Sequence, residues 1–121
     1  MSAGIKEVLF ISRKQDMLSF KKLFGTGNQL GMRFKYTFQA KQKGIPDAIN
    51  VANKFIAQQP FVLALADNLF IGESFQKTLR QVQSIKSGAA VLAVKTKYPS
   101  KSAVIDLGKK GKIKSIAWAC R

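Results

Sequence analysis

The hydrophobic pattern of this chain takes two forms, and each form predicts a different kind of strand. Residues 32–39 alternate strictly between apolar and polar, which predicts a strand with one buried face. Residues 61–66 and 89–94 are instead continuous apolar runs, which are typical of strands buried on both faces of a parallel sheet. A shorter apolar run at 7–11 predicts one more strand near the N-terminus.

Helical periodicity fills the intervals between these strands. Apolar residues recur there at spacings of three and four, which places them on one helix face. Asp16 can cap the first of these helices, and Pro46 suits the first turn of the second. The three apolar stripes are Met17, Phe20 and Phe24; Ala48, Ile49, Ala52, Phe55 and Ile56; and Phe75, Leu79 and Val82.

The end of the chain predicts a hairpin, with strands at 103–107 and 112–118 around a tight turn at 108–111. With the preceding elements this gives the order β-α-β-α-β-α-β followed by a hairpin. That order predicts an α/β fold with a Rossmann-like, mostly parallel sheet, helices on both faces and a C-terminal hairpin. No linker or repeat interrupts the pattern, so we expect residues 1–121 to form a single domain.

The composition excludes several kinds of site. The chain has no His and a single Cys, Cys120, so histidine-dependent catalysis and an internal disulfide are excluded. Any metal would need oxygen ligands, which favours Mg²⁺. No apolar run is long enough for a membrane span, and the first ten residues lack the pattern of a signal peptide, so we expect a cytoplasmic protein.

The net charge of +15 predicts attraction to polyanions such as nucleic acid, nucleotides, phosphorylated sugars or anionic lipid. A lysine-rich solvated surface explains the same charge equally well. The lysines are spread along the chain and form no block of five or six, so the sequence shows no basic arm.

Three loops carry candidate chemistry. Asp67 follows the apolar run 61–66, where it suits either a Mg²⁺ ligand or a turn residue. The basic loop 41–44 leaves a strand and enters a helix, so it suits an anion-binding turn or a plain solvated loop. The glycine-containing loop 25–27 leaves a helix instead, which indicates a helix-ending turn and not a phosphate loop.

Residues 5–111 resemble the sugar nucleotidylyltransferases, and among them most closely the glucose-1-phosphate thymidylyltransferases. Those enzymes join dTTP and glucose 1-phosphate into dTDP-glucose and pyrophosphate. The segment 65–72, Leu-Ala-Asp-Asn-Leu-Phe-Ile-Gly, is the most specific part of the resemblance. Order and spacing also hold for 5–12 with Gln15 and Asp16, for 24–27 with Gly31, and for 36–39 with Gly44 and Ala48.

The resemblance implies a nucleotide site. In that family, the residue at the position of Gln39 reads the pyrimidine base by hydrogen bonds, and the residue at Gly44 contacts the base through its backbone. Leu65 would pack near the nucleoside, and Asp67 would hold the catalytic Mg²⁺. The nucleotide would be dTTP or UTP. Gln39 and Asp67 would then both end strands at the same rim of a parallel sheet.

Departures from the family pattern lead us to expect no transfer from this chain alone, and we assign no catalytic residue. The family's G-G-x-G-T-R-L loop, which would precede Ile5, is absent. Ala66 and Ala103 stand where the family has Gly, and 118–120 replace its sugar-binding E-K-P. A first strand missing from the sheet would leave an exposed edge that favours self-association. Another chain could also supply the missing loop.

Two alternatives to a residual nucleotide site remain. One is a basic module that binds nucleic acid or another partner, and the other is a gene remnant without function.

Overall fold

The computed structural model of the chain describes residues 4–41, 43–69, 73–85, 87–98 and 103–118. Its contacts divide into two compact units, Met1–Gln81 and Val82–Arg121, so the single domain expected over residues 1–121 stays a prediction. Residues 70–72 and 119–120, which entered the comparison with the family pattern, lie outside the described residues. The elements are β1 (Glu7–Arg13), α1 (Met17–Phe24), η1 (Asn28–Leu30), β2 (Arg33–Gln39), α2 (Ile45–Ile56), α3 (Glu73–Gln83), β3 (Ala103–Leu107), η3 (Lys109–Gly111) and β4 (Ile113–Trp118).

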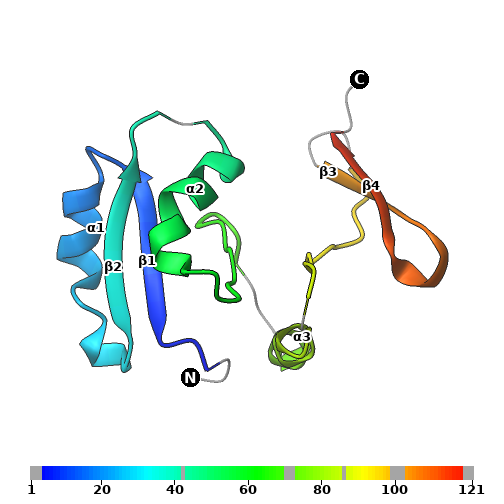
Figure 1. Cartoon of the computed structure of the whole chain (residues 1–121), viewed down its shortest axis with the longest axis horizontal. Helices are drawn as coiled ribbons and strands as arrows, with labels where there is room; N and C mark the ends of the chain where they lie inside the picture. The colour runs from blue at the N-terminus through cyan, green and yellow to red at the C-terminus, as the bar shows by residue number, and fades with distance from the viewer. Residues whose placement is uncertain (1–3, 42, 70–72, 86, 99–102, 119–121) are drawn as a thin grey trace. The chain divides into compact units, whose positions relative to one another are not determined.

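The first unit is built on a parallel pair of strands. β1 and β2 pair in a register that runs from Glu7 opposite Arg33 to Arg13 opposite Gln39. Figure 1 shows α1 on one side of this pair and α2 on the other. Parallel strands need a crossover connection, and α1 provides it here. The predicted strands at 7–11 and 32–39 and the helices on both faces of a parallel sheet are therefore confirmed.

Phe10 is the centre of the contact between α1 and the sheet. Its ring stacks on Phe24 of α1 at 5.1 Å between centroids and on Tyr36 of β2 at 5.3 Å. Phe34 meets the same ring edge to face at 5.2 Å. Such pairs contribute about 0.5–1.5 kcal/mol each beyond the area they bury. On the opposite face, the Nζ atom of Lys35 in β2 lies 5.4 Å from the centroid of the Phe55 ring in α2.

The loop after α1 is the helix-ending turn that its position predicts. Gly25 has φ +62°, and its N–H donates to the carbonyl of Lys21 at 2.9 Å. The Tyr36 hydroxyl donates to the Gly25 carbonyl at 2.7 Å, which ties this turn to β2. Gly27 is buried with φ +85°, and a Cβ there would stand 2.8 Å from the ring of Phe34. The loop therefore depends on glycine both for its backbone and for space.

The helix boundaries follow the sequence closely. Pro46 lies in the first turn of α2, as expected. Asp16 occupies the N-cap position of α1, as expected, but its side chain makes no capping hydrogen bond. Its carboxylate accepts a hydrogen bond from Arg13 Nε at 2.5 Å instead. The Asp16 carboxylate therefore pairs with a charged guanidinium and not with the backbone N–H groups of the first turn. No helix in the described segments is long and apolar enough to cross a membrane.

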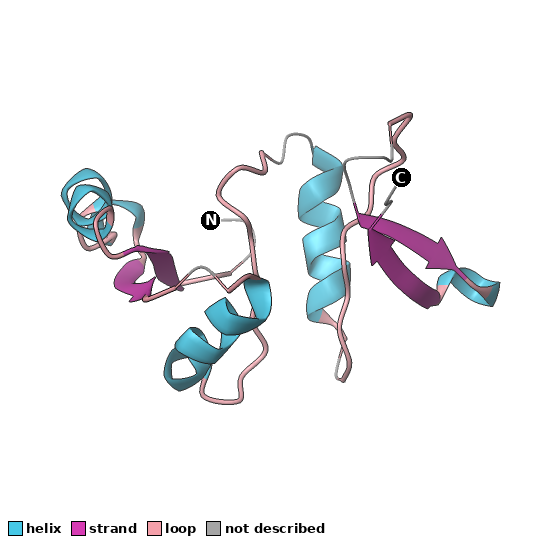
Figure 2. Ribbon diagram, turned by 90° about the horizontal axis from the view of Figure 1, so that it is seen from above, coloured by secondary structure: helices cyan, strands magenta, loops and turns pink. Residues whose placement is uncertain are grey.

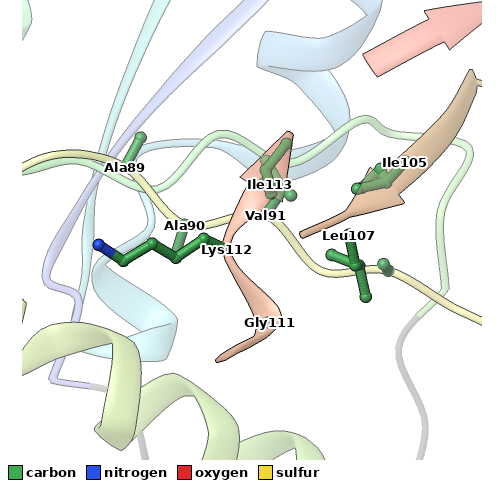
Figure 3. Close-up of a pocket in the computed structure, with 9 residues that line it drawn as sticks. Ala89, Ala90, Val91, Ile105, Leu107, Gly111, Lys112 and Ile113 are labelled. Atoms are coloured by element: carbon green, nitrogen blue, oxygen red, sulfur yellow. The ribbon is translucent and has the colours of Figure 1, made fainter. Parts of the chain in front are cut away.

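The second unit contains the predicted hairpin. β3 and β4 pair antiparallel, with Ala103 opposite Trp118 and an irregularity between Asp106 and Leu107. The helical turn η3 forms the connection between them (Figure 2). A mainly apolar cavity with a volume of about 410 Å³ lies between this hairpin and the segment 89–93. Figure 3 shows the side chains that line it. Its lining includes Ala90, Val91, Ile105, Leu107 and Ile113.

The strands predicted at 61–66 and 89–94 are wrong. Both segments are irregular and exposed, with Phe61 51% and Leu92 47% accessible. A continuous apolar run indicates a need for burial, but a strand forms only where a neighbouring strand supplies hydrogen-bond partners. In the described part of the chain neither run pairs, so the sheet is smaller than the mostly parallel sheet we expected.

The fold is therefore mixed α/β, with a two-stranded parallel sheet and an antiparallel hairpin. Among the described apolar side chains, Ala52 is the one that is buried. Within the described residues β1 pairs on one side alone, and self-association through its other edge stays a prediction.

Arg33 and Glu7 fix one end of the β1–β2 register. Arg33 Nε donates to Glu7 Oε1 at 2.9 Å, and Arg33 Nη2 donates to the same oxygen. These hydrogen bonds, and then the guanidinium charge, hold the pKa of the Glu7 carboxyl below its ordinary value of 4.5. The pair therefore stabilises the folded state above pH 4.5, and this contribution disappears as the pH falls through the lowered pKa.

Replacing Glu7 by Gln should reduce the loss of stability on acidification below pH 4.5. The effect should be small because both side chains are exposed. Urea unfolding at a series of pH values from about 7 to about 3 measures it. Arg33→Gln should change the profile in the same direction, and the double variant should add little to either. Unchanged acid profiles in both single variants would contradict the role of this pair.

Gly27→Ala should destabilise the first unit by about 2–4 kcal/mol, through its positive φ and the contact with Phe34. Gly31→Ala is the matched control, because Gly31 also has a positive φ but no heavy atom lies within 4 Å of the added Cβ. That control should cost about 1–2 kcal/mol. The urea midpoints of both variants give the comparison, and equal losses would show that packing against Phe34 is unimportant.

Candidate functional site

The connection from β2 to α2 brings together the two residues assigned to the base. Gln39 is the last residue of β2, and Gly44 directly precedes α2. The Gln39 side chain donates from Nε2 to the Gly44 carbonyl at 3.2 Å. The strand end and the helix start are thereby linked across the basic loop, and the Gln39 side chain is held at the mouth of that loop.

Asp47 is the third member of this arrangement, and the sequence reasoning missed it. It lies in the first turn of α2, and its Oδ2 accepts a second hydrogen bond from Gln39 Nε2 at 2.9 Å. This hydrogen bond is partly buried. An acid in the first helical turn is also favoured by the helix dipole, so the pattern gave no sign of its contact with Gln39.

Gly44 has a backbone that other residues rarely adopt, with φ +86°. Its carbonyl accepts from Gln39 and also from the Ala48 N–H at 3.3 Å. A residue with a side chain would strain this turn and shift the acceptor that holds Gln39. Glycine here thus positions the Gln39 carboxamide through the backbone.

The loop between Gln39 and Gly44 carries positive charge into solvent. Lys41 and Lys43 are exposed, and the Lys43 N–H donates to the Lys41 carbonyl at 2.9 Å. Lys14, which follows β1, lies 5.8 Å from the Phe38 ring near the end of β2. Exposed ammonium groups around this strand end would attract a phosphate chain.

Leu65 and Asp67 lie in the irregular segment that follows α2. Both are exposed, and the Leu65 carbonyl accepts from the Asn68 N–H at 3.1 Å, which places Asp67 in a turn. The rim expected to join Asp67 with Gln39 does not form, because 61–66 is not a strand of the β1–β2 sheet. None of the described contacts joins Leu65 or Asp67 to Gln39 or Gly44.

Asp67 differs from the other acids whose side chains are described, because it alone has no hydrogen-bond or ionic partner among the described residues. Glu7, Asp16, Asp47 and Asp106 contact Arg33, Arg13, Gln39 and Lys114 respectively. Within the described ranges no three acids, histidines or cysteines gather as a metal cluster. A single carboxylate fits Mg²⁺ where nucleotide phosphates complete the coordination, so Asp67 suits that shared arrangement and not an all-protein site.

Comparison with known proteins identifies the family. The model of the nucleotidyl transferase family matches residues 1–117. A glucose-1-phosphate thymidylyltransferase of Neisseria meningitidis serogroup A is 34% identical over 116 residues, covering 96% of this chain and 40% of the relative. Enzymes of the same name from Xanthomonas campestris and Mycobacterium tuberculosis are 31% and 32% identical; they match 97% and 92% of this chain, over 40% and 38% of their own lengths.

The chain thus spans about 40% of the length of the curated relatives it matches. The match includes the β1–β2 unit and the Gln39–Gly44 connection, and it extends through most of the hairpin. The chain therefore belongs to the nucleotidyl transferase family.

Proposed function

We propose that these 121 residues bind a thymine or uracil nucleoside triphosphate at the connection between β2 and α2, and do not carry out nucleotidyl transfer by themselves. The observation that carries the proposal is the contact of Gln39 with Gly44 and Asp47. It fixes a carboxamide at the position where the resembling enzymes read a pyrimidine. Gly44 exposes its backbone beside that carboxamide, which suits close approach of a base.

The phosphates of the nucleotide would extend into positive charge. Lys41 and Lys43 offer exposed ammonium groups on the same loop as Gly44. Mg²⁺, shared between Asp67 and the phosphates, would neutralise the remaining negative charge when it is bound. This part of the proposal requires the segment that contains Asp67 to approach the nucleotide.

Transfer makes larger demands than binding. Nucleotidyl transfer depends on holding the reacting groups in line and on neutralising the charge that develops, and each missing donor costs about 10²–10³ in rate. The chain covers only 40% of the thymidylyltransferase from Neisseria meningitidis that it matches. The described residues offer one unpaired carboxylate, Asp67, which is enough for binding but not for this chemistry.

The proposal predicts weak dTTP binding that Mg²⁺ strengthens. Asp67→Ala should abolish that gain, with a loss of affinity of about tenfold in the presence of Mg²⁺. Titration calorimetry with dTTP, with and without Mg²⁺, measures it. Asp106→Ala is the control, because Asp106 lies in the second unit beside Lys114 and should leave binding unchanged. If dTTP gives no binding heat with Mg²⁺ present, the proposal is wrong.

A basic nucleic-acid module is the second candidate, favoured by the net charge of +15. Most lysines whose side chains are described are exposed, so the charge is available to a phosphate backbone. The sequence has no recognisable nucleic-acid motif, which makes this candidate weaker than the nucleotide site.

Nucleic-acid binding would depend steeply on salt. Each phosphate contact to single-stranded RNA should contribute about 0.7 to the slope of log K against log salt concentration. Fluorescence anisotropy with labelled RNA between about 50 and about 300 mM salt gives this slope, and Asp67→Ala should not weaken the affinity. No RNA binding at the lowest salt concentration would remove this candidate, and absence of both activities would favour a remnant without function.

A further inference from the structure

Two hydrogen-bond acceptors determine which way the Gln39 carboxamide is oriented, that is, where its nitrogen and its oxygen lie. Nε2 donates to the Gly44 carbonyl at 3.2 Å and to Asp47 Oδ2 at 2.9 Å. A backbone carbonyl and a carboxylate can only accept hydrogen bonds. If the carboxamide turned over, its own oxygen would face both of these acceptors, and the two hydrogen bonds would be lost. Both N–H groups of the amide nitrogen are therefore used in hydrogen bonds within the protein.

The oxygen end of Gln39 is then the end available to a ligand. Both N–H groups have partners, and no described residue donates to Oε1. The site thus presents a hydrogen-bond acceptor to whatever binds there. Thymine and uracil carry an N–H at ring position 3, which can donate to Oε1. Cytosine has an unprotonated nitrogen at that position, so two acceptors would face each other.

We propose that Asp47 is a positioning residue that orients the Gln39 carboxamide with its oxygen toward a ligand, so that the site selects bases with an N3–H over cytosine. This inference rests on the proposed function, because it requires a nucleotide at Gln39. Asp47 is suited to this role because it lies in the first turn of α2, where a negative charge is favoured, and its hydrogen bond with Gln39 is partly buried. Gly44 gives the second acceptor, but Asp47 gives the charged and stronger one.

The selectivity should be large enough to measure. When Oε1 of the half-buried Gln39 faces the acceptor nitrogen of cytosine, the complex lacks about one hydrogen bond, and both atoms still give up their hydration. This cost corresponds to roughly 10- to 100-fold in affinity. We therefore expect the full chain, with Mg²⁺ present, to bind dTTP and UTP about 10- to 100-fold more tightly than CTP.

Asp47→Asn tests the role of Asp47 directly. An Asn at this position can offer either its oxygen or its nitrogen, so it permits both orientations of Gln39. The ratio of dTTP to CTP affinity should fall to about 3-fold or less, with CTP binding strengthened. Asp47→Glu, which keeps an acceptor-only end, should retain most of the ratio. Asp67→Ala should weaken dTTP and CTP binding equally and leave the ratio unchanged.

The outcomes separate the two proposals. A wild-type chain that binds dTTP while Asp47→Asn keeps the full ratio would overturn the positioning role and leave the proposed function intact. Equal loss of both nucleotides in Asp47→Asn would likewise reduce Asp47 to a structural residue. No dTTP binding by the wild-type chain would overturn both.

A second measurement does not depend on the variant folding. In the wild-type chain, the two Gln39 Nε2 proton resonances should shift little when dTTP is added, since the base contacts the oxygen end. A large shift of these protons, of the kind a new hydrogen bond from Nε2 produces, would show that the nitrogen reads the base and would overturn the inference.

Discussion

The packing of Phe10 against the rings of Phe24 and Tyr36 is the interaction on which the first unit depends. It joins α1 to both strands at once, and so it closes the crossover that makes β1 and β2 parallel. The register set by this pairing carries the chain from Tyr36 to Gln39, opposite Arg13. The strand end that bears Gln39, and the turn into α2 beyond it, are placed by contacts between residues far apart in sequence.

Those parts of the fold that depend on local pattern could be predicted from the sequence. The alternation that ends at Gln39, the stripe that begins at Met17 and the hairpin closed by η3 all occur at the expected places. The apolar runs 61–66 and 89–94 could not be placed correctly, because a strand with two buried faces is defined by its neighbours and not by its own residues. Their hydrophobicity indicated that these runs favour burial, but it could not identify the residues that would bury them.

In the candidate site, too, the features that local residues determine could be predicted, and those that depend on distant contacts could not. Resemblance assigned Gln39 and Gly44 to the same base, and the structure links them through a turn that local residues determine. The expected meeting of Asp67 with Gln39 relied on the 61–66 strand and failed with it. Asp47 escaped notice because an acid in a first helical turn already has an ordinary explanation; its contact with Gln39 emerges from the fold alone.

The scarcity of buried apolar side chains among the described residues has a thermodynamic consequence. Among the described apolar side chains only Ala52 is buried, while many large ones, such as Leu18 and Val94, are largely exposed. The heat capacity of unfolding arises chiefly from apolar surface that becomes hydrated when the chain unfolds. From the described residues we therefore expect a small heat capacity of unfolding, and with it a stability that changes only gradually with temperature.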